Sequence, residues 1–107
     1  MTKKETAAHV AGEWWAHRLQ KGDKEKFARE VEKRVFEKLQ TEKFVDLECD
    51  YDPQGILLDA VRAIGIECSG MFFSANGILP QKHSLRVTED WLEPKEGYGN
   101  WSDKILI

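Results

Sequence analysis

Two short segments in the last third of the sequence carry the side chains best suited to holding a small anionic ligand. Within residues 80–83, Lys82 offers an ammonium group and His83 an imidazole, and Arg86 adds a guanidinium shortly after. Residues 97–101 combine aromatic rings with an asparagine amide and two glycines. A base with a phosphate is bound by aromatic stacking together with cationic and hydrogen-bond donors. The pattern predicts a nucleotide-type ligand site at Lys82, His83, Arg86, Tyr98, Asn100 and Trp101, with Lys95 as a further source of positive charge.

The same rings also suit a different partner. Trp91 and Trp101 could form an aromatic hot spot for a protein, since tryptophan is enriched among the residues that dominate interface energetics. Trp91 is explained more simply as a ring that seals the end of a sheet. Gly97 and Gly99 do not form a phosphate-binding loop, because no Gly-Lys-Ser/Thr sequence follows them.

A small hydrolase is the alternative function, with either Cys68 as the nucleophile and His83 as the base or a metal bound by carboxylates. Cys68 lies in an apolar segment, and no helix N-terminus follows it to lower its pKa. A cysteine that packs as a small core hydrophobe explains the position better. The sequence therefore favours a non-enzymatic binding protein, and we assign no catalytic residue.

Two rows of potential metal ligands also occur. His9, Glu13 and His17 share one helix face, but the row spans more than about 10 Å, which is too long for a single ion. A second, acidic row could hold a divalent metal through its carboxylates, or it could face a basic protein partner. Its members alternate along one segment: Asp46, Glu48, Asp50 and Asp52. We assign no metal and no cofactor.

Length and charge limit the function further. The chain has 107 residues, 41% of them hydrophobic and 33% charged, as expected for one folded domain over residues 1–107. Its net charge of -3 argues against general nucleic-acid binding, which needs an excess of cations. Residues 1–42 carry ten basic and eight acidic side chains, whereas residues 43–107 carry six and eleven. No apolar run is long enough to span a membrane, and the chain begins with a polar helical pattern, so we expect a cytoplasmic protein without a membrane partner.

Two helices are predicted in the first half. Over residues 3–20, a stripe at helical spacing consists of Ala8, Ala11, Trp15 and Leu19. Asp23 is the expected N-cap of the second helix, whose apolar residues Phe27, Val31, Val35 and Leu39 recur every four positions. One of the adjacent Trp14 and Trp15 rings should face the core. The other should lie at its boundary or on the surface, where it would be a candidate dimer contact.

The second half changes to a period of two at Lys43, where Val45, Leu47 and Cys49 alternate with acidic residues and predict a strand. Asp52-Pro53 should open a third helix that Gly65 ends. The remaining predicted elements are a strand over residues 67–74, a turn at Asn76-Gly77, a short return at Ile78-Leu79, a strand around Leu85 and Val87, a turn or short strand at Trp91-Leu92, a loop over residues 95–100 and an edge strand over residues 105–107. The predicted fold is α+β: two N-terminal helices, then a small, mainly antiparallel sheet with a third helix packed on one face.

A class resemblance rests on the compact size, the Lys/Glu-rich helical start and two segments. These segments are Asn76-Gly77-Ile78-Leu79-Pro80-Gln81-Lys82-His83 and Glu93-Pro94-Lys95-Glu96-Gly97-Tyr98-Gly99-Asn100-Trp101. With these features the chain resembles the short accessory proteins of unassigned function that bacterial phages and prophages encode. The resemblance carries over no site residue. It implies a counter-defence role in the host cytoplasm, either sequestering a nucleotide signal, for instance at a homo-oligomer interface, or blocking a host protein.

Overall fold

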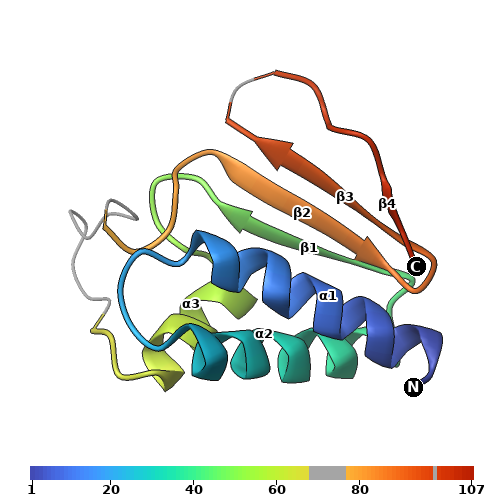
Figure 1. Cartoon of the computed structure of the whole chain (residues 1–107), viewed down its shortest axis with the longest axis horizontal. Coiled ribbons are helices and arrows are strands. Elements are labelled where there is room, and N and C mark those ends of the chain that lie inside the picture. The colour runs from blue at the N-terminus through green and yellow to red at the C-terminus, as the bar shows by residue number, and fades with distance from the viewer. Residues whose placement is uncertain (68–76, 98) are drawn as a thin grey trace.

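The computed structural model describes residues 1–67, 77–97 and 99–107 of the chain. Two helices, α1 (Lys3–Arg18) and α2 (Lys24–Leu39), come first, as the sequence predicts. The later elements follow in the order β1 (Phe44–Cys49), α3 (Ile56–Ala63), β2 (His83–Thr88), β3 (Trp91–Glu96) and β4 (Ile105–Leu106). The strands form one antiparallel sheet in the order β1-β2-β3-β4, above the helices in Figure 1. The α+β prediction is therefore confirmed.

Both N-terminal helices begin at side-chain caps. Thr2 and Glu5 form a capping box, in which each side chain accepts a hydrogen bond from the backbone N–H of the other residue. The Asp23 carboxylate accepts from the Lys26 N–H at 3.1 Å, as predicted. Gly12 lets the helices approach closely, since a Cβ there would lie 2.4 Å from the Ala28 carbonyl oxygen.

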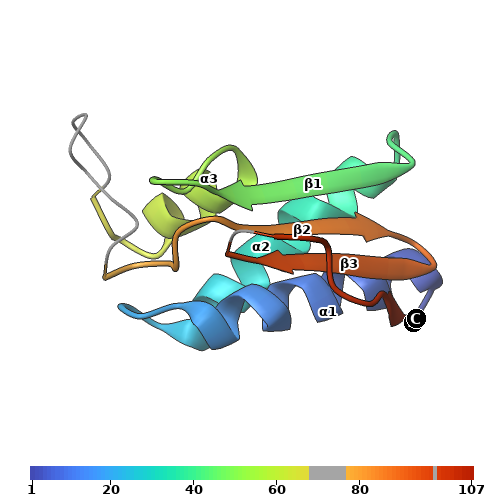
Figure 2. The ribbon, with the colours of Figure 1, turned by 90° about the horizontal axis from the view of Figure 1, so that it is seen from above.

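The helices cover one face of the sheet, and no helix of residues 1–67, 77–97 or 99–107 covers the other (Figure 2). The covered face carries the alternate strand residues, which are buried: Val45, Leu47, Cys49, Leu85, Val87 and Leu92. Trp15 and Phe27 are the largest side chains buried between the layers, with no exposed surface. Because side chains alternate along a strand, their neighbours on β1 to β3 point to the uncovered face.

The predicted start of the third helix is wrong. Asp52 does not cap α3, which begins at Ile56 after Gly55, whose φ is 54°. Pro53 instead lies opposite Cys49 in an isolated antiparallel bridge, and the Gln54 N–H donates to the Glu48 carbonyl at 3.2 Å. The chain therefore makes a tight turn against the end of β1 before the helix starts, and a capping pattern does not indicate this turn.

The predicted return strand at Ile78 and Leu79 is also wrong. Both residues are buried in a turn, and the Ile78 carbonyl accepts from the Gln20 N–H at 2.7 Å. This segment therefore anchors to the end of α1 and does not pair with a strand. Apart from Glu67 and Gly77, the strand predicted over residues 67–74 and the turn at Asn76-Gly77 lie outside the described residues.

Pro94 lies inside β3, so the loop predicted from Lys95 begins only at Gly97. Pro94 is opposite Leu85, and its carbonyl accepts from the Ser102 N–H at 2.8 Å on the side away from β2. The missing proline N–H therefore costs no hydrogen bond to β2, which is why the strand continues through it. The terminal strand prediction is confirmed by β4.

The tryptophan pair does not expose a ring. Trp15 has no exposed surface and Trp14 only 9%, with the two rings edge to face at 4.8 Å. Trp14 lies at the core boundary, as one of the two should, but Arg18 covers it, so it offers no dimer contact. None of the helices in the described part of the chain is long and apolar enough to cross a membrane.

Candidate functional site

The uncovered sheet face carries a row of charges that crosses three strands. Asp46 on β1 lies opposite Arg86 on β2, which lies opposite Glu93 on β3. Arg86 donates from Nε to Asp46 Oδ1 at 2.8 Å and from Nη2 to Asp46 Oδ2 at 3.0 Å. This two-bond contact is the main cause that raises the pKa of Arg86 above its usual value. The guanidinium is therefore held in one orientation on the sheet surface.

Aromatic rings flank this guanidinium. The Arg86 Cζ atom lies 4.6 Å from the centre of the Phe44 ring and 5.9 Å from that of Trp101. Phe44 is 50% exposed and Trp101 is 42% exposed. Lys95 Nζ lies 6.0 Å from the same Trp101 ring. We call Phe44, Asp46, Arg86 and Trp101 the open-face cluster.

The residues predicted to bind a ligand separate in the structure. Arg86 and Trp101 meet in the open-face cluster, with Lys95 beside them. His83 shares a register position with Cys49 and Glu96 on the covered face, 6.4 Å from the Trp14 ring, and its Nδ1 lies 2.9 Å from the Gln81 carbonyl oxygen. Asn100 is exposed, and Tyr98 lies outside the described residues. The six-residue ligand site thus stays a prediction, and the structure assembles only part of it.

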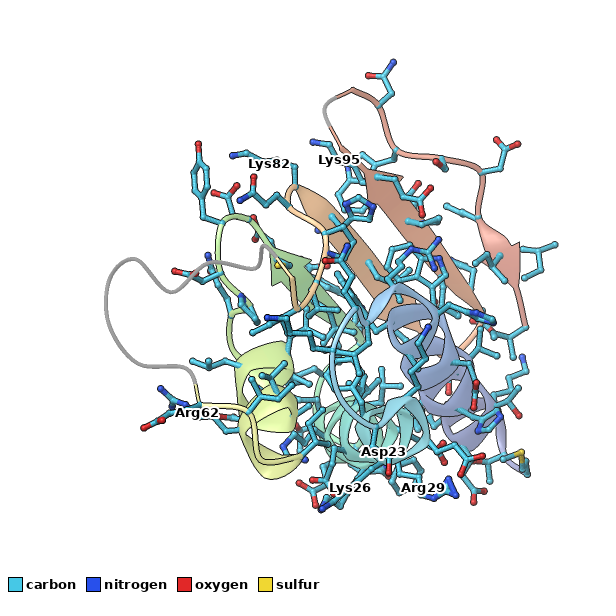
Figure 3. The ribbon with its side chains drawn as sticks, turned by 60° about the vertical axis from the view of Figure 1, so that its left-hand side comes forward. Asp23, Lys26, Arg29, Arg62, Lys82 and Lys95 are labelled. Atoms are coloured by element: carbon cyan, nitrogen blue, oxygen red, sulfur yellow. The ribbon has the colours of Figure 1, made fainter. Side chains whose placement is uncertain are left out.

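Lys82 joins the two predicted segments through its backbone. Its N–H donates to the Asp50 carbonyl at 3.1 Å, and its own carbonyl accepts from the Gly97 N–H at 2.8 Å. Lys82 also holds a left-handed conformation, with φ at 58°, which is costly for a residue with a Cβ. Its ammonium pairs with the Asp50 carboxylate and lies 4.7 Å from the Tyr51 ring centre. Figure 3 shows Lys82 and Lys95 at one end of the molecule, far from Asp23 and Arg29 at the other.

A second arginine–aromatic group lies where the covered face meets the edge of α1. Arg18 stacks on Trp14 with its Cζ atom 3.5 Å from the ring centre, and its Nε donates to Glu96 Oε1 at 2.8 Å. The Arg18 hydrogen bond is the main cause that lowers the pKa of Glu96. We call Trp14, Arg18, His83 and Glu96 the covered cluster. It ties α1 to β3 and gives His83 a packing role.

The metal and thiol chemistries find little support in the described residues. His9 Nδ1 lies 2.9 Å from Glu32 Oε1 on the neighbouring helix. Within the described ranges, no group of three or more His, Cys, Asp or Glu side chains could hold a metal ion. Burial, aided by nearby carboxylates, raises the pKa of Cys49 to about 12, so this thiol is not a nucleophile near neutral pH. Cys68 lies outside the described residues, so the hydrolase alternative stays untested.

Sequence reasoning missed Phe44, although a signal was present. Phe44 alternates in step with Asp46 and Glu48, so its side chain lies on the same face of the predicted strand as theirs. A large aromatic ring on this solvent-exposed face is unusual. A hollow of about 480 Å³ lies near the start of β1, where the end of α2 meets the turn between β2 and β3. Charges of both signs line it, and none of the predicted ligand residues does.

Comparisons with models of protein families, with curated proteins and with solved structures find no match. The surface of the molecule therefore has to carry the functional argument.

Proposed function

We propose that this chain is a non-enzymatic binding protein that holds a protein partner on its uncovered sheet face. One observation carries the proposal: Phe44 and Trp101, each about half exposed, flank an Arg86 guanidinium that Asp46 holds in place. Tryptophan and arginine are the side chains most enriched at the energetic centres of protein interfaces, and aromatic rings in general are enriched there.

The held guanidinium favours a protein over a free phosphate. Arg86 already has Asp46 as its anionic partner, and Lys82 has Asp50, so a phosphate would have to compete with a carboxylate at either cation. A protein surface has no such requirement, because it can pack on the rings and leave the ion pair intact. The surrounding charges are of both signs, as in the polar rim of a protein interface.

A nucleotide-type ligand is the second candidate. The backbone contact between Lys82 and Gly97 joins the two segments in which the sequence places that ligand. Lys95 and Arg86 also approach one face-exposed ring, Trp101, on which a base could stack. Both candidates use Trp101, so the same variants can be tested for protein capture and for nucleotide binding.

The resemblance to phage accessory proteins completes the proposal. If it holds, the partner is a host protein, the location is the host cytoplasm, and the chain blocks its partner without changing it chemically. An uncovered sheet face suits such a role, since inhibition by occupation needs surface complementarity and no catalytic group.

The test compares capture of proteins from a bacterial lysate by the immobilised wild-type chain and by three variants. Trp101→Ala and Phe44→Ala should each lose a protein that the wild type retains, because each removes an anchor ring. Tyr51→Ala is the matched control, since Tyr51 is also an exposed ring (59%) but lies outside the open-face cluster. The captured protein is then purified, and its affinity for all four chains is measured.

A thermal-shift series with mononucleotides and dinucleotides runs in parallel. A rise in the wild-type midpoint that Trp101→Ala abolishes would support the nucleotide candidate instead. Capture that the Tyr51→Ala change weakens as much as the two open-face changes would contradict the proposed surface.

A further inference from the structure

Among the described residues, the first strand of the sheet pairs with a neighbouring strand on one side only. The strand order places β1 at one margin, with β2 as its only strand neighbour among the described residues (Figure 2). Its six residues alternate strictly between exposed and buried side chains. A regular margin strand of this kind presents backbone N–H and C=O groups to which another strand can bond.

The backbone groups of Phe44 and Asp46 are the ones that point outward. In an antiparallel ladder, both polar groups of a residue point to the same side, and the side alternates along the strand. The Glu48 carbonyl accepts from the Gln54 N–H on the side away from β2, so Phe44 and Asp46 share that direction. The Pro94 carbonyl supports this assignment, because it bonds Ser102 on the side away from β2. Pro94 lies opposite Leu85, so the backbone groups of Leu85 point to Leu47 on β1. The residues on either side of Leu47 therefore direct their backbone groups away from β2.

Charge rows across the sheet specify what a further strand should carry. One row runs Glu93, Arg86, Asp46, alternating in sign up to the margin. The next runs Lys95, Ser84, Glu48, and it ends on a carboxylate for which the described residues show no ion pair. Opposite charges directly across strands stabilise a sheet, so the Asp46 row calls for a cation at the next position. Gln54 occupies the position directly beside Glu48, so that carboxylate attracts a cation from the end of the added segment. The row that ends at the half-exposed Phe44 calls for an apolar side chain.

We propose that the partner contributes a short basic segment that adds to β1 as a fifth strand. This inference rests on the proposed function and names the partner's chemistry: lysine or arginine opposite Asp46, a further cation at the end of the segment near Glu48, and an aromatic or aliphatic residue opposite Phe44. The intervening side chains face Leu47 and Val45, so they are apolar. The turn that bonds the Glu48 carbonyl closes the strand end, so the added segment pairs with residues 44–47 and ends beside Glu48.

A second copy of this chain does not fit the same place. In the two registers that overlap five residues, antiparallel pairing of β1 with itself would set Asp46 against Glu48, or Asp46 against its own counterpart, and like charges directly opposite are destabilising. The acidic margin thus opposes self-association and selects a basic strand. The region from residue 42 to residue 52 holds five carboxylates and one lysine.

The probe is a peptide with the core Lys-Val-Arg-Val-Phe. In antiparallel order it places its arginine opposite Asp46, its ring opposite Phe44 and its lysine at the end beside Glu48. The reversed-charge control has the core Glu-Val-Glu-Val-Phe. A third peptide keeps the basic side chains but carries N-methyl groups on the two backbone nitrogens that would bond β1. Each is titrated to about 1 mM, which detects even weak strand addition, and amide exchange is followed by NMR.

We expect the basic peptide alone to bind and to slow exchange of the Phe44 and Asp46 amides. Glu48→Lys should weaken its binding roughly tenfold, because an attraction becomes a repulsion. Glu25→Lys on α2 makes the same charge change at an exposed site on the helical layer and should leave binding unchanged. Binding of the acidic or N-methylated peptide as tightly as the basic one would overturn the proposal, as would failure of the Glu48→Lys change to matter.

The outcome is separable from that of the proposed function. If the Trp101-dependent partner is captured but the basic peptide neither binds nor protects the two amides, strand addition is wrong and the open-face interface stands. If both fail, both are wrong. A concentration-dependent dimer in analytical ultracentrifugation that Glu48→Lys alters would assign the margin to a second copy and would also overturn strand addition.

Discussion

The covered cluster and the open-face cluster are built from the same chemistry and differ in what lies over them. In each, an arginine stacks on an aromatic ring and binds a carboxylate from another element: Arg18 with Trp14 and Glu96, and Arg86 with Phe44 and Asp46. The stacked ring is 9% exposed in the first and 50% exposed in the second.

This difference separates a structural contact from a surface available for binding. Arg18 covers Trp14 and fixes α1 to β3, so its interactions are completed within the chain. Arg86 is equally well oriented, but the rings beside it still expose apolar area to water, and covering that area is left to another molecule. Orientation without burial is the property that points to a partner.

The largest contrast between the two faces should appear in thiol reactivity on β1. Two single-thiol proteins are compared, both with Cys68→Ser. The first keeps Cys49, which measures thiol reactivity on the covered face. The second carries Phe44→Cys and Cys49→Ala, and its thiol measures reactivity on the open face. Burial raises the pKa of Cys49 to about 12 from a usual value of 9.0. At pH 8 its thiolate fraction is therefore roughly a thousandfold lower than that of an exposed thiol. Labelling with a maleimide at pH 8 should therefore be at least that much faster at position 44.

Unfolding in denaturant is the control, since both thiols should then react at similar rates. Comparable labelling rates at the two positions in the folded protein would mean that β1 does not have one buried and one open face.

The next contrast concerns stability. Trp14→Ala removes a buried ring on which Arg18 stacks, and it should lower the free energy of unfolding by about 3 kcal/mol. Phe44→Ala removes a half-exposed ring and should cost about 0.5 kcal/mol, while abolishing capture of the partner. Urea unfolding followed by circular dichroism measures both values.

A binding defect in Phe44→Ala that came with an equally large stability loss would make the open-face cluster a second structural clamp. The contrast with Trp14 would then disappear.

The sequence predicted the elements whose information is local. Helices α1 and α2 follow from apolar residues at helical spacing and from the Asp23 cap, and β1 follows from strict alternation at Val45 and Leu47. The predicted start of α3 is wrong because Pro53 pairs with Cys49 across a tight turn, which a capping pattern does not reveal. The predicted strand at Ile78 is wrong for a different reason, since Ile78 bonds to Gln20 at the end of a helix far away in the sequence.

The sequence predicted some residues of the candidate site by their type, but it did not predict where the fold places them. Arg86 and Trp101 were singled out by residue type, and they do meet. His83 was grouped with them because it is close in sequence, yet strand alternation turns its ring to the covered face. Phe44 comes from a segment about forty residues earlier, and only the register of β1 against β2 brings it to Arg86.

The smallest predicted effect distinguishes the clusters by pH. The folded-state pKa of Glu96 is lowered, chiefly by its hydrogen bond with Arg18, so the stability it contributes is present above the usual glutamate pKa of 4.5 and is lost as the pH falls through the lower folded value. Glu96→Gln should cost less than about 1 kcal/mol at pH 7, because the Glu96 side chain is 47% exposed, and this cost should disappear once the pH is below the folded-state pKa of Glu96.

Thermal midpoints of wild type and Glu96→Gln between pH 3 and pH 7 measure this convergence. Arg86→Ala provides the comparison, since the hydrogen bonds with Asp46 raise the pKa of Arg86 above its already high usual value and this side chain stays charged throughout that range. A Glu96→Gln deficit that stays constant with pH would show that Arg18 holds α1 to β3 through its stacking on Trp14 and not through the carboxylate. The covered cluster would then owe its stability to burial alone, the one property that the open-face cluster lacks.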